Sequence, residues 1–184
     1  MRMNPLRSLL MVAALSAIGG GCATRDTGRD AGIRLLERTT ATTTFIIVRH
    51  AEKAADDPKD PSLSDAGRMR AQRASERLAG ERVTATYATG YRRTQMTAAK
   101  TAEAHGLDIT IYDAAQPAAD FAARLRRAHT AGVVLVVGHS NTVADIAGAL
   151  CACTVTPLRE DEYDRWIEIR IERDGAGKFE ETRY

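Results

Sequence analysis

Two apolar runs that each end in a histidine constrain this chain more than any other feature. The first is Phe-Ile-Ile-Val-Arg-His at 45–50, and the second is Val-Val-Leu-Val-Val-Gly-His at 133–139. Neither run alternates with polar residues, which predicts strands buried on both faces, the pattern of a parallel sheet. Because ligands bind at the carboxyl ends of the strands in such sheets, we expect His50 and His139 to lie beside a ligand crevice.

The order of the remaining patterns predicts the fold class. Strand-like runs at 43–48, 84–88, 109–112 and 133–137 alternate with helical runs that begin near 64, 92, 118 and 142. This alternation predicts an α/β fold, a three-layer sandwich with a mostly parallel central sheet. Residues 165–172 alternate polar and apolar, which predicts an antiparallel edge strand with one face in water. Four arginines along the first helix predict a solvated face: Arg68, Arg70, Arg73 and Arg77.

The N-terminus has the features of an export signal. Arg2 and Arg7 precede an apolar stretch at 9–18, and small residues lead from there to Cys22. This arrangement predicts a signal peptide over 1–21, because the apolar stretch is too short to span a bilayer comfortably. The small residue before Cys22 resembles a lipidation motif of bacterial lipoproteins, although the usual leucine three residues before the cysteine is absent. We expect lipidation at Cys22, with an ordinary cleaved signal as the alternative.

Residues 22–42 are polar and rich in Thr, Arg, Asp and Gly, a composition typical of a flexible tether. The folded domain is therefore expected at 43–184. We expect an exported protein of the periplasm or cell envelope, which contacts the membrane only through its N-terminal lipid anchor.

Charge and cysteine content exclude several classes of partner. The chain has 26 Lys and Arg against 24 Asp and Glu, and removal of the signal peptide would take two of the bases, so the mature protein is neutral. This balance argues against a nucleic-acid partner. An oxidising compartment permits a disulfide between Cys151 and Cys153, and two small buried residues without a bridge are the alternative. Neither this pair nor the pair His50 and His139 has enough further ligands for a zinc site.

The histidines and their neighbours suit chemistry on a phosphoryl group. A neutral imidazole attacks phosphorus without a base to activate it, provided that a hydrogen bond orients the ring. Arg49 directly precedes His50, is always charged, and matches phosphoryl oxygens with a planar pair of donors. His139 would add another donor if it were protonated.

Four motifs in order resemble those of the histidine phosphatase superfamily, also called phosphoglycerate mutase-like, and in particular its small bacterial branch. The motifs are Arg49-His50-Ala51, Leu63-Ser64-Asp65-Ala66-Gly67, the segment from Thr89 through Arg93 to Thr97-Ala98, and Gly138-His139-Ser140. The family signature has glycine where this chain has Ala51. The resemblance covers about 43–184 and implies a phosphoglycerate mutase-like fold.

The resemblance also implies roles for individual residues. His50 would attack phosphorus and carry a phosphohistidine intermediate, which water then hydrolyses. Arg49, Arg93 and His139 would stabilise the transferring phosphoryl group, and Ser140 would help to bind the substrate. Neither a metal ion nor another cofactor is implied.

The proton donor to the leaving group is less well defined. The mutase branch has a glutamate after the third strand, and Asp113 stands at the corresponding place in this chain. Glu52, two residues after His50, is the rival, unless it is a loop carboxylate paired with a neighbouring base.

We therefore expect a histidine acid-type phosphatase that hydrolyses small phosphate monoesters. The alternatives are a phosphohistidine protein phosphatase and a non-catalytic envelope lipoprotein that binds an anionic ligand. Mutase activity is less favoured, because the chain is short and lacks the long insertions that shape the mutase pocket.

Overall fold

The computed structural model describes residues 41–184, so the predicted signal peptide, most of the tether and Cys22 lie outside the described residues. In chain order the elements are β1 (Ala41–Arg49), α2 (Asp65–Leu78), β2 (Val83–Ala88), α3 (Arg92–His105), β3 (Ile109–Ile111), α4 (Ala118–Ala128), β4 (Gly132–Gly138), α5 (Val143–Cys151), β5 (Arg165–Glu172) and β6 (Gly177–Arg183). Within this range, none of the helices has the length and apolar character needed to cross a bilayer.

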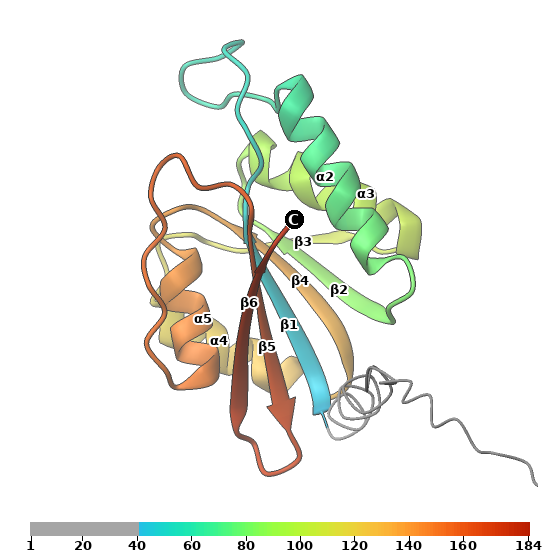
Figure 1. Cartoon of the computed structure of the whole chain (residues 1–184), viewed down its shortest axis with the longest axis vertical. Coiled ribbons are helices and arrows are strands. Elements are labelled where there is room, and N and C mark those ends of the chain that lie inside the picture. The colour runs from blue at the N-terminus through green and yellow to red at the C-terminus, as the bar shows by residue number, and fades with distance from the viewer. Residues whose placement is uncertain (1–40) are drawn as a thin grey trace, which may run out of the picture.

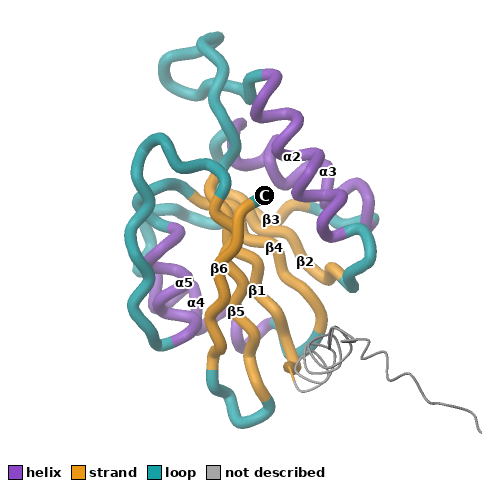
Figure 2. Tube along the Cα trace, in the orientation of Figure 1, coloured by secondary structure: helices purple, strands orange, loops and turns teal. Residues whose placement is uncertain are grey.

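The strands form one six-stranded sheet in the order β3-β2-β4-β1-β5-β6 (Figure 1). The first four in this order are parallel, whereas β5 and β6 are each antiparallel to the neighbour before them. Figure 2 shows α4 and α5 on one side of the sheet and α2 and α3 on the other. The predicted three-layer α/β fold with a mostly parallel sheet is confirmed.

The side chains of β1 divide the core into its two halves. Phe45 and Ile47 pack in the cluster that includes α4, α5 and the isoleucines of β5. Ile46 and Val48 point the other way and pack with α2 and α3. Successive side chains of a strand point to opposite faces, so a strand covered on both sides must be apolar at every position. This explains the unbroken apolar run in the sequence.

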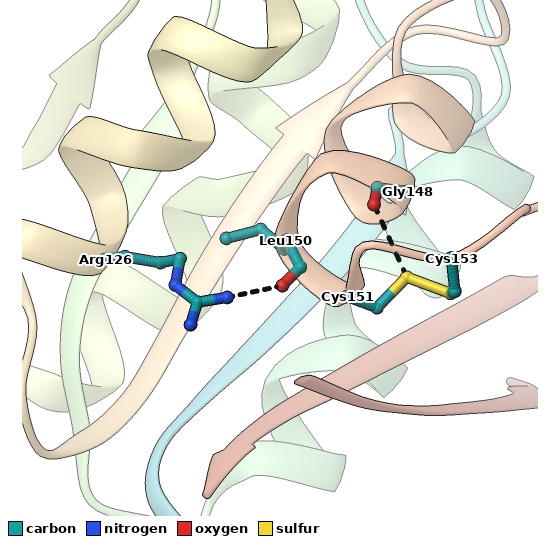
Figure 3. Close-up of a disulfide and its surroundings, with 5 residues drawn as sticks. All are labelled: Arg126, Gly148, Leu150, Cys151 and Cys153. Carbon is teal, nitrogen blue, oxygen red and sulfur yellow. Dashed lines mark hydrogen bonds between the residues drawn. A yellow bond between two sulfur atoms is a disulfide. The ribbon is translucent and has the colours of Figure 1, made fainter. Parts of the chain in front are cut away.

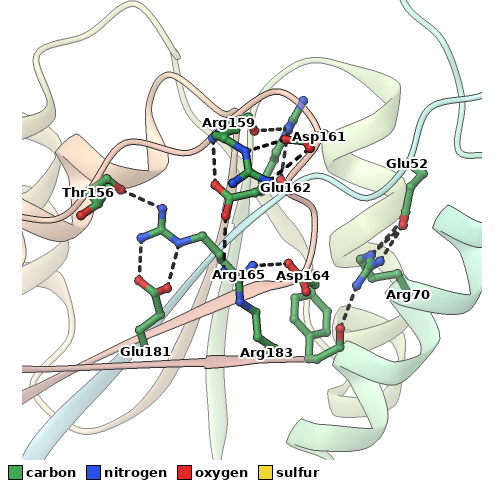
Figure 4. A network of polar contacts seen from close by, with 12 residues as sticks. Glu52, Arg70, Thr156, Arg159, Asp161, Glu162, Asp164, Arg165, Glu181 and Arg183 are labelled. Carbon is green, nitrogen blue, oxygen red and sulfur yellow. Dashed lines mark hydrogen bonds and ion pairs between the residues drawn. The ribbon is translucent and has the colours of Figure 1, made fainter.

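The antiparallel strand β5 differs from its prediction in two respects. It is antiparallel as predicted, but it lies between β1 and β6 and is not an edge strand, and its two arginines, Arg165 and Arg170, are buried. Arg165 forms two hydrogen bonds with the Glu181 carboxylate, at 3.0 and 2.5 Å (Figure 4). Arg170 pairs with Glu168 and Glu180. Strand β6 supplies acids that neutralise these arginines, which allows an alternating sequence to be buried.

Three of the four arginines of α2 are exposed as predicted, Arg68, Arg73 and Arg77, whereas Arg70 is half-buried. Arg70 donates to the Glu52 carboxylate and to the backbone carbonyl of Tyr184, and Arg77 lies 4.5 Å from the ring centre of Trp166. The chain end that follows β6 returns to this helix (Figure 1). Arg70 and Arg77, which the helical pattern predicts to face water, therefore also contact protein.

The N-terminal end of the folded domain shows how a long-range contact extends a local element. Strand β1 starts at Ala41, two residues before the predicted start, and the Thr42 hydroxyl donates to the carbonyl of Ile171 at 3.1 Å. The predicted tether therefore ends inside the sheet, because β5 offers partners to these residues.

Cys151 and Cys153 form a disulfide at the C-terminal end of α5, with their Cα atoms 5.1 Å apart. Ala152 between them adopts a left-handed conformation with φ 52°, and Arg126 of α4 donates to the carbonyl of Leu150 at 2.8 Å (Figure 3). The structure thus resolves the sequence alternatives in favour of the bridge. The bridge ties the start of the long irregular segment 152–164 to the end of the helix.

Helix α2 is positioned by a close backbone contact. The Ser64 hydroxyl caps the helix by accepting from the amide of Gly67, and the Ser64 amide donates to the carbonyl of Glu52 at 3.0 Å. A Cβ atom added at Gly67 would overlap that same carbonyl oxygen. The glycine therefore allows α2 to lie directly against the loop that follows His50.

We predict that Gly67→Ala lowers the free energy of unfolding by about 1–3 kcal/mol, because the backbone around Glu52 must move. Denaturant unfolding measures this difference. Gly80→Ala is the matched control, since an added Cβ there has nothing within 4 Å and its φ is not in the left-handed region. We expect the control to be unchanged or slightly more stable, and equal stabilities for the two variants would contradict the prediction.

Candidate active site

The pairing of β1 with β4 brings the two predicted histidines together. The strands are in register from Thr43 and Gly132 to Arg49 and Gly138, and the His50 amide donates to the Gly138 carbonyl at 2.9 Å. Both histidines therefore leave parallel strands at the same edge of the sheet, with their ring centres 5.4 Å apart. The prediction that they meet at the carboxyl edge is confirmed.

The His50 ring is held in one tautomer. Its Nδ1 atom lies 2.9 Å from the carbonyl oxygen of Ala51, and because a carbonyl only accepts, Nδ1 must carry a hydrogen. In the neutral ring the lone pair is then on Nε2. Burial is the main cause that lowers the pKa of His50, to about 3, and the positive charges of Arg49 and Arg93 lower it further. The imidazole is therefore neutral at physiological pH and can act as a nucleophile.

His139 is held in the opposite tautomer by a chain of hydroxyl groups. Its Nε2 atom lies 3.0 Å from the Thr89 hydroxyl, which lies 2.9 Å from the Thr94 hydroxyl. Thr94 donates to the carbonyl of Tyr91 at 2.7 Å, so Thr89 donates to Thr94 and accepts from His139. Burial, followed by Arg93 and Arg49, lowers the pKa of His139 to about 4. Without a bound anion His139 is neutral, whereas the sequence left its protonation open.

Arg93 lies in the first turn of α3, at the same edge of the sheet. Its guanidinium packs 4.2 Å from the ring centre of Tyr91, and Nη1 is 3.8 Å from a carboxylate oxygen of Asp60. The neighbouring Arg92, which the motif spacing passed over, pairs with Asp56 and is half exposed. The structure therefore places Arg93, and not Arg92, among the groups that influence the two histidines.

Arg49 is almost completely buried and has two kinds of partner. Its Nη1 atom donates to the carbonyl oxygens of Arg159, Glu160 and Glu162 at 2.8–3.1 Å. Its Nη2 atom donates to the Glu160 carboxylate at 3.0 Å, and the Tyr163 ring covers the guanidinium at 4.1 Å. Arg49 thus anchors the segment before β5 in addition to its place beside His50.

Both arginines retain an unused donor. Within residues 41–184, the buried Nε atoms of Arg49 and Arg93 have no hydrogen-bond partner. A buried donor without an acceptor is costly, and an oxyanion is the ligand that forms the strongest bonds with guanidinium groups. In the same range, no group of three or more His, Cys, Asp or Glu side chains is arranged to hold a metal ion. The site is thus best suited to an anion.

The two candidate proton donors have different surroundings. Burial opposes ionisation of Glu52, but the hydrogen bonds and charge of Arg70 outweigh it, and the pKa of Glu52 is lowered. Glu52 is therefore an ionised partner of Arg70, as its alternative reading proposed (Figure 4). Asp113 is exposed, accepts from the amide of Ala115, and lines a cavity of about 190 Å³ to which Asn141 also contributes. Asp113 is thus the candidate that lies beside the loop of His139.

Several residues of the site were not singled out by the sequence. Thr89 appeared only as a motif position, yet it orients His139. Glu160 and Tyr163 belong to the irregular segment 152–164, which has no periodicity or motif that could identify them. Ser140 was predicted to bind substrate, and its hydroxyl donates to Glu160 at 2.6 Å.

Comparison with known proteins agrees with this geometry. The family model of the histidine phosphatase superfamily (branch 1) matches residues 45–116, which include Arg49, His50, Arg93 and Asp113. No curated protein is similar enough in sequence to count as a match.

Solved structures extend the likeness beyond the matched segment. The protein histidine phosphatase SixA, in a complex with tungstate, superposes with a TM-score of 0.61 at 18% identity, over 76% of this chain and 96% of its own. A putative alpha-ribazole-5'-P phosphatase from Escherichia coli gives a TM-score of 0.62 at 15% identity, over 78% of this chain and 97% of its own. A phosphoserine phosphatase from Entamoeba histolytica gives 0.59 at 12% identity, over 77% and 97% of the two chains.

At these identities the likeness is one of fold. It covers 76–78% of the chain, more than the segment that the family model matches. The family model matches residues of β1 and α3, and the fold brings these residues to the edge of the sheet that carries His139. Residues 45–116 thus match the histidine phosphatase superfamily (branch 1), and the chain shares the fold of these solved phosphatases.

Proposed function

We propose that this protein is a phosphatase that hydrolyses small phosphate monoesters through a phosphohistidine on His50. The observation that carries the proposal is the state of His50, which is neutral, held at Nδ1 by the Ala51 carbonyl, and left with a lone pair on Nε2. Two arginines with unused buried donors lie in the same site. A nucleophile beside paired cationic donors is the arrangement that phosphoryl transfer needs.

In the proposed reaction, Nε2 of His50 attacks phosphorus and the bond from phosphorus to the ester oxygen breaks. Arg49 and Arg93 stabilise the charge on the phosphoryl oxygens. The dianion would also raise the pKa of His139, because it compensates the arginines that lower that pKa now. Water then attacks the phosphohistidine and releases inorganic phosphate. We propose that no metal ion takes part.

The lowered pKa of His50 also supports an acid-type enzyme. A histidine with a pKa of about 3 remains unprotonated throughout weakly acidic solution, so the nucleophile is not lost as the pH falls through 6 and 5.

The test is turnover of a chromogenic aryl phosphate by the domain 41–184 in the presence of a chelator. We expect hydrolysis at pH 5 and at pH 7.5, and a loss of at least about a thousandfold in kcat for His50→Ala, since the covalent route is removed. His105→Ala, which changes a histidine at the end of α3, is the control and should retain activity. Activity that survives in His50→Ala would show that the nucleophile is a different residue.

We propose Asp113 as the proton donor to the leaving oxygen. Its exposed carboxylate lies at the end of β3, on the edge that carries His139, whereas Glu52 is committed to Arg70. A donor matters most when the leaving group is a poor one, because an alkoxide must be protonated as it departs.

Asp113→Asn should therefore lower kcat on an alkyl phosphate by about a hundredfold and leave an aryl phosphate with a good leaving group nearly unaffected. Steady-state kinetics on the two esters measure the difference. Asp108→Asn, a change of the same kind just before β3, should not alter the ratio between the substrates. An equal loss on both esters would argue against proton donation by Asp113.

We also propose that the protein is exported and anchored through a lipid on Cys22. The sequence pattern of 1–22 supports this, and a disulfide between Cys151 and Cys153 is compatible with an oxidising compartment. Metabolic labelling of the full chain with a radioactive fatty acid should mark the wild type and not Cys22→Ser. Cleaved protein without label in the wild type would favour the ordinary signal peptide.

A further inference from the structure

The Glu160 carboxylate holds two of the groups that the proposed phosphatase needs for its substrate. One oxygen accepts from Nη2 of Arg49 at 3.0 Å, and the other accepts from the hydroxyl of Ser140 at 2.6 Å. Arg49 and Ser140 are both among the proposed phosphoryl-binding residues. A carboxylate with two such donors resembles, in charge and geometry, part of a bound phosphoryl group.

This carboxylate is charged and its side chain is free to move away. The hydrogen bond from Ser140 and the charge of Arg49 lower the pKa of Glu160, so it is ionised at neutral pH. Its side chain is 81% exposed, whereas the Arg49 side chain is 2% exposed. An ion pair with one partner in water is weak, so a stronger anion can replace the carboxylate.

The backbone of the same segment is held independently of this side chain. Nη1 of Arg49 bonds the carbonyls of Arg159, Glu160 and Glu162, and the Tyr163 ring packs on the guanidinium. These contacts remain if the Glu160 carboxylate leaves. The carboxylate can therefore exchange with a ligand without unfolding the segment.

The catalytic histidines are closed off in this arrangement. His50 is 3% exposed and His139 is 9% exposed. Displacement of Glu160 would free Nη2 of Arg49 and the hydroxyl of Ser140 next to these rings. A phosphoryl group that binds these two donors therefore takes the place of the carboxylate.

We propose that Glu160 is a specificity-determining residue, an internal anion that a substrate must displace from Arg49 and Ser140. This inference rests on the proposed function and names the class of substrate more closely. A terminal phosphoryl group carries two negative charges and competes well against one carboxylate. A phosphodiester or a sulfate ester carries one charge and competes poorly. Glu160 therefore selects phosphate monoesters by raising the cost of binding singly charged groups.

The test is calorimetric binding of inorganic phosphate, and of dimethyl phosphate as the singly charged probe, to the domain 41–184 at pH 8. We expect Glu160→Gln and Glu160→Ala to bind inorganic phosphate more tightly by on the order of fivefold, the scale of an exposed ion pair. Dimethyl phosphate should gain more than inorganic phosphate, so that the discrimination between the two anions falls. The matched control is Asp161→Asn, because Asp161 lies on the same segment and pairs with Arg159 instead of Arg49.

Thermal unfolding checks that each variant is folded. If one of the two Glu160 variants does not fold, the other still provides the binding measurement. Unchanged or weaker binding in both Glu160 variants would overturn the inference, as would an equal gain in Asp161→Asn.

Aryl phosphate kinetics separate the two proposals. Turnover with the same KM in wild type and Glu160→Gln would refute the role of Glu160 and leave the phosphatase intact. Tighter anion binding by the Glu160 variants without any turnover would support the role of Glu160 and refute the phosphatase activity. No anion binding by any variant would refute both proposals.

Discussion

The site depends on the in-register parallel pairing of β1 with β4. That pairing bonds the His50 amide to the Gly138 carbonyl and places the two imidazoles at one edge of the sheet. A slip of one residue would send the β1 side chains to the wrong layers, because Phe45 and Ile47 fill one half of the core and Ile46 the other. The same apolar packing that stabilises the fold therefore fixes the distance between the two imidazole rings.

Burial at this edge sets the chemistry as well as the position of the residues. Removal from water keeps His50 and His139 neutral, and the neighbouring arginines reinforce the effect. The cost is an excess of buried positive charge, which Glu160 and three backbone carbonyls offset at Arg49. A site that is stabilised by an internal anion before the substrate arrives can exchange that anion for a phosphoryl group.

The sequence predicted well wherever local pattern and tertiary environment agree. Helix α3 begins at Arg92, as predicted, and ends at Gly106 in a left-handed conformation, and its buried face contains Thr94 and Thr97. The predictions were wrong where a distant segment supplied partners. Alternation in β5 indicated a wet face, but acids from β6 neutralise Arg170, and the chain end covers Arg70.

The sequence by itself determined the α/β class and the two histidines at strand ends, because these follow from apolar runs, and its resemblance to a known family singled out the arginine at the start of α3. Only the tertiary structure decided the tautomers of the histidines, the bridge between Cys151 and Cys153, and the place of Glu160 beside Arg49. Glu160 is 111 residues from Arg49 in the chain. Contacts of that kind depend on where an irregular segment crosses the sheet edge, and no local pattern of side chains encodes that path.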